Sequence, residues 1–103
     1  MRAFHKTVAL TAVPEQLQAE DYFVKKFTIM PIKSDGTDNG DKTGIGNASD
    51  MSITVLGSGK VLAVLAPLQQ KTFEAKGSGA YNLKDFWIDV TTAGDGVLVL
   101  IED

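Results

Sequence analysis

The sequence contains no cysteine and a single histidine, His5. The lack of cysteine excludes a disulfide framework and thiolate metal sites, and it leaves the cellular compartment open. A zinc or cupin-type site needs several imidazoles from neighbouring strands, which one histidine cannot supply. A Ser-His-Asp arrangement would have to use His5, close to the N-terminus, so this kind of catalysis is disfavoured. We therefore expect neither a cofactor nor enzymatic activity.

Long apolar runs and an excess of basic residues are also missing. The longest fully apolar run is VLAVLAP, residues 61–67, which is far too short to cross a bilayer. The N-terminal MRAFHKTVAL has neither the apolar region nor the cleavage site of a signal peptide. The net charge is −3, whereas binding to a nucleic-acid duplex needs a basic face. These features predict a protein made and assembled inside a cell, with no membrane and no nucleic acid as partner.

The 103 residues instead carry short apolar segments separated by glycine and proline turns. Strands are expected at residues 4–12, 22–32, around Ile53 and Val55, and at 61–66, 71–75, 86–92 and 97–103. The apolar residues of 22–32 change face midway, which predicts either a bulge or burial on both sides of the strand. Gly94-Asp95-Gly96 is expected to form a hairpin turn. The pattern predicts one all-β domain spanning 1–103, a jelly-roll-like β-sandwich of about seven or eight strands with no substantial helix.

The stretch KSDGTDNGDKTGIGNASD, residues 33–50, holds four aspartates and four glycines. Asp35, Asp38 and Asp41 are spaced by three, whereas an EF-hand loop places its ligands at every second position. Counted from Asp35, Gly46 stands where the bidentate glutamate of that loop is required. Asp, Asn and Gly are also the residues that turns use. An irregular calcium loop is the alternative to a plain connection.

Two glycine motifs in and near this stretch resemble phosphate-binding loops. Gly44-Ile45-Gly46 lacks the third glycine and the following helix of a dinucleotide fingerprint. Gly59-Lys60 resembles the end of a P-loop, but Val61 occupies the position of the magnesium-binding Ser or Thr. We therefore interpret 33–50 as a long polar loop between strands, or an arm that becomes ordered on a partner. Its candidate partner-contacting residues are Asp35, Asp38, Asn39 and Asp41.

Two strands that we expect to be neighbours, VLAVLA at residues 61–66 and VLVLI at residues 97–101, are apolar on both faces. In VLVLI, residues 97–101, Val97, Val99 and Ile101 point one way and Leu98 and Leu100 the other. In a third strand, residues 86–92, the inward residues are Phe86, Ile88 and Val90, and Trp87 lies on the opposite face. A two-layer sandwich has one inner face per sheet, so the outward set needs another cover. We expect an interface between subunits formed by Trp87, Leu98, Leu100, Leu62 and Val64.

The second half of the chain, GIGNASD followed by NLKDFWIDVTTAGDGVLVLIED, resembles a pattern found in small virion proteins of tailed phages. The matching residues are Gly46, Asn47, Ser49, Leu83, Asp85, Trp87, Asp89, Val90, Gly94, Gly96 and Val97. TVALTAVPEQL and FVKKFTIMPI look like the opening strands of that family. The chain departs from the pattern in LAPLQQ, which lacks the usual glycine, and in residues 51–66, which look like an insertion.

The resemblance implies a capsid decoration or cement protein, or a fibre-associated protein, with a jelly-roll-like sandwich, a terminal hairpin and no cofactor. It implies a bacteriophage virion protein on the capsid surface that forms a dimer or trimer and binds the phage major capsid protein. The alternative is a carbohydrate-binding β-sandwich module with Trp87, Tyr22 and Tyr81 as sugar platforms. A hydrolase using His5 and nearby acids ranks third.

Overall fold

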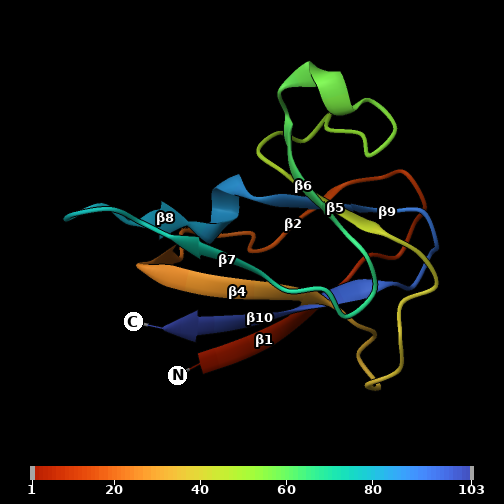
Figure 1. The fold of residues 1–103 in the computed structure, drawn as a ribbon, viewed down its shortest axis with the longest axis horizontal. Coiled ribbons are helices and arrows are strands. Elements are labelled where there is room, and N and C mark those ends of the chain that lie inside the picture. The colour runs from red at the N-terminus through yellow and green to blue at the C-terminus, as the bar shows by residue number, and fades with distance from the viewer. Residues whose placement is uncertain (1, 103) are drawn as a thin grey trace.

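A computed structural model describes residues 2–102 of the chain (Figure 1). This range contains ten β-strands and two 3₁₀ turns, so the predicted all-β class is confirmed. The strands are β1 (Arg2–Thr7), β2 (Glu15–Gln16), β3 (Phe23–Val24), β4 (Lys26–Pro31), β5 (Thr43–Gly46), β6 (Val61–Leu65), β7 (Lys71–Glu74), β8 (Tyr81–Asn82), β9 (Trp87–Val90) and β10 (Gly96–Glu102). The 3₁₀ turns are η1 (Leu56–Ser58) and η2 (Leu83–Asp85).

The strands form two four-stranded antiparallel sheets that pack as a sandwich, and a small two-stranded sheet. Sheet A has the order β1-β10-β4-β7, and sheet B has the order β2-β9-β5-β6. Strands β3 and β8 pair with each other at one end of the molecule. This small sheet raises the total above the expected count of about seven or eight strands.

The core lies between the two large sheets, and alternation along the strands explains which side chains enter it. The inward residues of β4, β5, β9 and β10 are fully buried: Phe27, Ile29, Ile45, Ile88, Val90, Val97, Val99 and Ile101. An aromatic cluster closes one end, where Phe27 stacks on Phe73 with ring centroids 5.0 Å apart. Phe86 and Tyr81 pack edge-on against Phe27 at 5.1 and 5.9 Å. The predicted inward parity of 86–90 and 97–101 is therefore confirmed.

The predicted change of face within 22–32 falls at Lys25, between β3 and β4. Val24 is buried in the small sheet, and Phe27 and Ile29 are buried in sheet A. Lys25 interrupts the strand, so that residues 23–24 pair in the small sheet and residues 26–31 pair in sheet A.

The predicted hairpin at Gly94-Asp95-Gly96 is wrong. Strand β9 belongs to sheet B and β10 to sheet A, so the turn crosses from one layer to the other. Gly94 has a φ of 90° there, a conformation that glycine adopts without steric cost. The terminal hairpin implied by the family resemblance is absent for the same reason.

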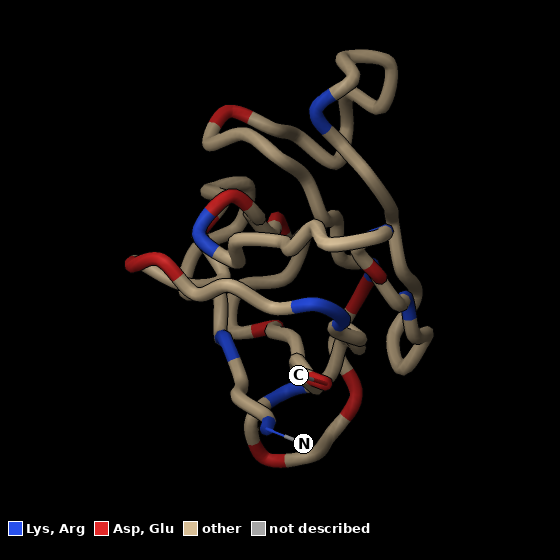
Figure 2. Tube along the Cα trace, turned by 90° about the vertical axis from the view of Figure 1, so that its left-hand side faces the viewer, with Lys and Arg blue, Asp and Glu red and all other residues tan. Residues whose placement is uncertain are grey.

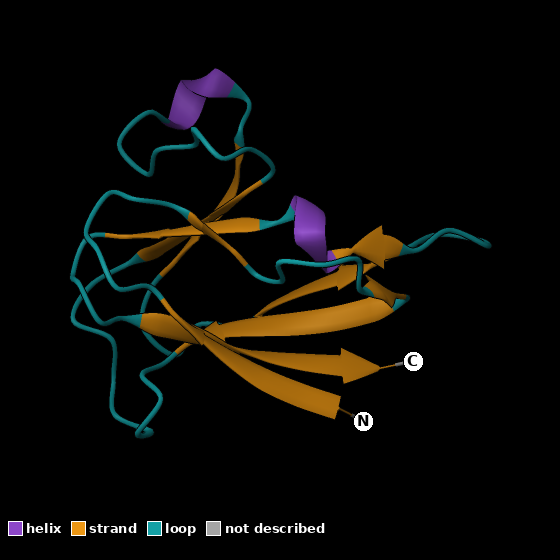
Figure 3. Ribbon diagram, turned by 180° about the vertical axis from the view of Figure 1, so that it is seen from behind, coloured by secondary structure: helices purple, strands orange, loops and turns teal. Residues whose placement is uncertain are grey.

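Two further expectations about the middle of the chain are corrected. Residues 33–50 are not one continuous loop, because Thr43–Gly46 form β5, whose four residues are all buried. Ile53 and Val55 do not form a strand; they lie in the segment 47–59, which carries η1. Figures 1 and 3 show this segment projecting beyond the end of β6.

Within residues 2–102 no helix has the length and apolar character needed to cross a bilayer. Figure 2 shows acidic and basic positions distributed around the whole molecule.

Candidate functional site

The five residues expected to form one subunit interface lie on two different sheets. Leu98 and Leu100 belong to β10 in sheet A, whereas Trp87 belongs to β9 in sheet B. Leu62 and Val64 lie on β6, at the edge of sheet B. The expectation assumed that the two apolar strands were neighbours, but they are in opposite layers. The set therefore divides into separate surfaces.

Leu98 and Leu100 are the centre of a surface that we call the outer strip. Strand register places Leu98 between His5 and Met30, and Leu100 between Ala3 and Thr28. We define the outer strip as these six residues on the face of sheet A that points away from the core. Leu98, Leu100 and Met30 each keep part of their surface in solvent. At its end, Lys26 and Glu102 form an ion pair at 3.3 Å, so a charged rim borders an apolar centre.

The outward face of β5, in sheet B, is covered by the chain itself. Met51 and Ile53, from segment 47–59, are 2% and 5% exposed and lie over Gly44 and Gly46 of β5. A Cβ built on Gly46 would come within 2.5 Å of the Met51 Sδ. Glycine therefore occupies both outward positions of β5 because the covering segment lies directly on the backbone. The Gly-Ile-Gly motif has this packing role and opens no helix.

The covering segment is also held by a buried carboxylate. Asp89, on the outward parity of β9, is 1% exposed, and its Oδ2 accepts a hydrogen bond from the Ile53 N–H at 3.0 Å. An ion pair between Lys60 and Asp50 at 2.5 Å closes the base of the segment. Beyond these anchors, Val55 and Leu56 at η1 and Leu62 on β6 stand exposed.

The polar loop 32–42 is folded against the start of β10. Asn39 is 5% exposed; its amide donates to the Gly96 carbonyl at 2.8 Å and to the Thr43 hydroxyl at 3.2 Å. The Gly96 N–H donates back to the Asn39 Oδ1 at 3.2 Å. Asn39 therefore holds the loop against the start of β10, and its assignment as a partner contact stays a prediction.

Asp95 is the second anchor of this loop. Its carboxylate is fully buried and accepts the Gly40 N–H at 2.9 and 3.0 Å and the Asp41 N–H at 3.3 Å. These bonds hold the loop against the chain itself, and its role as an arm on a partner stays a prediction.

The three aspartates of the loop are exposed, and two of them have local hydrogen bonds. The Thr37 hydroxyl and then the Thr37 N–H lower the pKa of Asp35 below its usual value. The Lys42 N–H and then the Thr91 hydroxyl lower the pKa of Asp41. In residues 2–102, no three Asp, Glu or His side chains are grouped so that they could hold a metal ion.

His5 is held by both ring nitrogens. Its Nε2 donates to the Ile32 carbonyl at 2.7 Å, and the Thr7 hydroxyl lies 3.3 Å from its Nδ1. A triad would instead need one nitrogen on a nucleophile and the other on a carboxylate.

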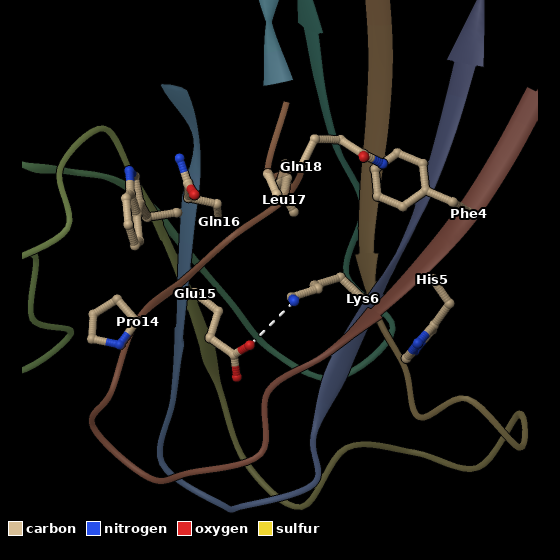
Figure 4. Close-up of a pocket in the computed structure, with 10 residues that line it drawn as sticks. Phe4, His5, Lys6, Pro14, Glu15, Gln16, Leu17 and Gln18 are labelled. Carbon is tan, nitrogen blue, oxygen red and sulfur yellow. Dashed lines mark ion pairs between the residues drawn. The ribbon is translucent and has the colours of Figure 1, made fainter. Parts of the chain in front are cut away.

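One cleft opens between the edge strands β1 and β2, with a volume of about 550 Å³ (Figure 4). Its wall on β1 is formed by Phe4, His5 and Lys6. Pro14 to Ala19 and Trp87 form the other side. Glu15 and Lys6 point toward each other across it and form an ion pair at 3.1 Å. The sequence patterns missed this cleft because its two walls are separate segments, which only the fold brings together.

No protein-family model, curated protein or solved structure matches the chain.

Proposed function

We propose that this chain is a non-enzymatic structural protein of a bacteriophage virion. It serves as a capsid decoration or cement protein that forms a homo-oligomer on the capsid surface and stabilises the shell of the major capsid protein. The phage assignment rests on the sequence resemblance of residues 46–49 and 83–97 to tailed-phage virion proteins. The structural support comes from the strand order and from one exposed face.

The strand order supports a jelly roll. Numbered in chain order without β3 and β8, the strands read 1-8-3-6 in sheet A and 2-7-4-5 in sheet B. Every connection except that between the fourth and fifth strands, β5 and β6, then crosses from one sheet to the other. Two interlocked Greek keys of this kind recur in viral capsid proteins and in lectins.

The observation that carries the assembly role is the outer strip. In sheet B, Met51 and Ile53 cover the outward face of β5, whereas in sheet A Leu98, Leu100 and Met30 are partly in solvent. An apolar centre with a charged rim is the usual composition of a protein interface. A stable interface buries about 800 Å² on each partner, so the outer strip would be its centre and the surrounding residues its periphery.

The test compares aspartate substitutions on the two faces of β10. Leu98→Asp should give a folded monomer, because an unpaired carboxylate is too costly to bury between subunits. Val99→Asp should prevent folding, because Val99 is fully buried in the core. The measurements are circular dichroism, mass in solution, and cosedimentation with capsids that lack the protein.

Two results would contradict the proposal. If wild type is monomeric and does not cosediment with capsids, the assembly role is wrong. If Leu98→Asp retains the wild-type mass and capsid binding, the interface lies elsewhere than the outer strip.

The alternative function, a carbohydrate-binding module, has one specific observation in its favour. Of the three candidate platforms, Tyr81 packs into the aromatic cluster, and Tyr22 packs against Phe4 at 6.1 Å with the Arg2 guanidinium 5.0 Å from its ring centroid. Trp87 lines the cleft. The three aromatics therefore do not form a row of coplanar exposed rings. The feature that favours sugar binding is the single indole of Trp87 in the cleft.

A further inference from the structure

We propose that the cleft between β1 and β2 is a binding site for a neutral saccharide. This inference rests on the alternative function, the carbohydrate-binding module, and not on the virion role, because the cleft and the apolar centre of the outer strip are different surfaces. Only His5 belongs to both, and its ring nitrogens are engaged by Ile32 and Thr7.

The size of the cleft suits a small organic ligand. Its volume of about 550 Å³ lies within the range of roughly 300–1,000 Å³ that is usual for small-molecule sites. It opens at the side of the sandwich, between β1 at the edge of sheet A and β2 at the edge of sheet B. The facing strand β2 is only two residues long, so most of β1 has no strand opposite it. A chain of sugar rings can enter such an open cleft without any part of the protein moving.

The charges of the cleft favour a neutral ligand. Lys6 and Glu15 neutralise each other at 3.1 Å, and the second oxygen of Glu15 accepts the Ala9 N–H at 3.0 Å. Burial raises the pKa of Glu15, but the Ala9 N–H and the Lys6 ammonium outweigh it and hold that pKa below its usual value. An anion would have to compete with Glu15 for Lys6, and a cation would have to compete with Lys6 for Glu15. Hydroxyl groups can bond to both members of the pair without separating them.

The remaining lining combines flat apolar surfaces with amides. Trp87 and Phe4 offer surfaces for the C–H face of a sugar ring, and indole is well suited because it is both large and able to donate a hydrogen bond. Gln16 and Gln18 extend from the opposite wall, and Figure 4 shows the Gln18 side chain reaching toward Phe4. An amide both donates and accepts, as a hydroxyl does. The Gln16 Nε2 donates to the Lys84 carbonyl at 3.0 Å, which orients its Oε1 as an acceptor.

The experiment uses the single tryptophan of the chain as a reporter. The wild-type protein is screened on an array of neutral, sialylated and sulfated glycans, and the hits are titrated by Trp87 fluorescence. In parallel, NMR follows the side-chain N–H signals of Trp87, Gln16 and Gln18. We expect neutral glycans to bind and to shift these three sets of signals.

Variants separate the cleft from the rest of the molecule. Trp87→Ala and Gln18→Ala should each weaken glycan binding, the first by about tenfold or more. Because Trp87→Ala lacks the fluorescent reporter, its titration follows the Gln16 and Gln18 side-chain N–H signals instead. Leu98→Asp should leave it unchanged, so this site and the assembly face can fail independently. Gln18→Ala is the decisive variant if Trp87→Ala does not fold, because Gln18 lies outside the strands. The proposal is overturned if no neutral glycan binds, if only charged glycans bind, or if Gln18→Ala binds as wild type does.

Discussion

Replacing Asp95 by alanine tests whether a buried carboxylate holds the polar loop in place. The carboxylate is fully buried and accepts the N–H groups of Gly40 and Asp41. Hydrogen bonds to a charged group contribute about 1.5–3 kcal/mol each. The Gly40 N–H is shared between both oxygens and counts once, and the Asp41 bond at 3.3 Å is long. Water replaces part of the loss because both donors belong to exposed residues. We therefore expect the free energy of unfolding to fall by about 2–3 kcal/mol.

The assay is urea unfolding followed by Trp87 fluorescence, with thermal melting as a second measurement. For a domain near this size, 1 kcal/mol corresponds to roughly 4–8 °C in Tm, so Asp95→Ala should melt roughly 10–20 °C lower. Asp95→Asn keeps one acceptor oxygen and should lose about half as much stability. The matched control is Asp38→Ala, in the same loop but exposed, which should stay within about 0.5 kcal/mol of wild type.

Hydrogen exchange gives the local version of the same test. The Gly40 and Asp41 amides should exchange faster in Asp95→Ala, while the amides of β4 keep the protection set by global unfolding. The reasoning is refuted if Asp95→Ala is as stable as Asp38→Ala, or if the two loop amides exchange no faster than in wild type.

Two further predictions concern the cover of sheet B and the cleft. Gly46→Ala should cost about 1–3 kcal/mol, because the new Cβ meets both the Lys60 carbonyl oxygen and the Met51 Sδ. Gly57→Ala, with nothing within 4 Å, should be nearly neutral in the same urea titration. Equal stabilities would show that neither Met51 nor Lys60 lies against the backbone of β5. Glu15→Gln should remove about 0–1 kcal/mol at neutral pH. Because the folded-state pKa of Glu15 is depressed, its contribution to stability is fully present above its usual pKa and is lost as pH falls through the folded-state pKa. The stability difference between wild type and Glu15→Gln should therefore shrink between pH 7 and pH 3, and a difference that grows toward acid would contradict the assigned ion pair.

Strand interiors were predictable from the sequence because alternation is a local property. Val97, Val99 and Ile101 enter the core as their spacing indicates, and Phe73 does so from β7. The connections were not predictable in the same way. Gly94-Asp95-Gly96 suits a hairpin and a crossover equally well, and the choice depends on which sheet receives β10.

The same limit applies to the candidate surfaces. Ile53 looks like a strand residue because it is β-branched and apolar, yet its partner is the backbone of β5 rather than a neighbouring strand. The sequence did contain one sign of this packing, the pair Gly44 and Gly46. Two glycines on one face of a strand often mark a place where another segment approaches the backbone closely. Leu62 and Leu98 have similar sequence surroundings, and only the topology reveals that they lie in opposite sheets.

The anchoring of Asn39 also bears on how the protein ages chemically. Asn39 precedes Gly40, and an asparagine followed by glycine is prone to deamidation because no Cβ shields its amide carbon from the next backbone nitrogen. Here the amide is bound to Gly96 and Thr43, and the attacking nitrogen of Gly40 directs its N–H at the Asp95 carboxylate. Cyclisation must break both arrangements, so it proceeds only from molecules in which the loop has opened. Conversion of Asn39 to aspartate in stored material then records the accumulated time that this loop has spent open.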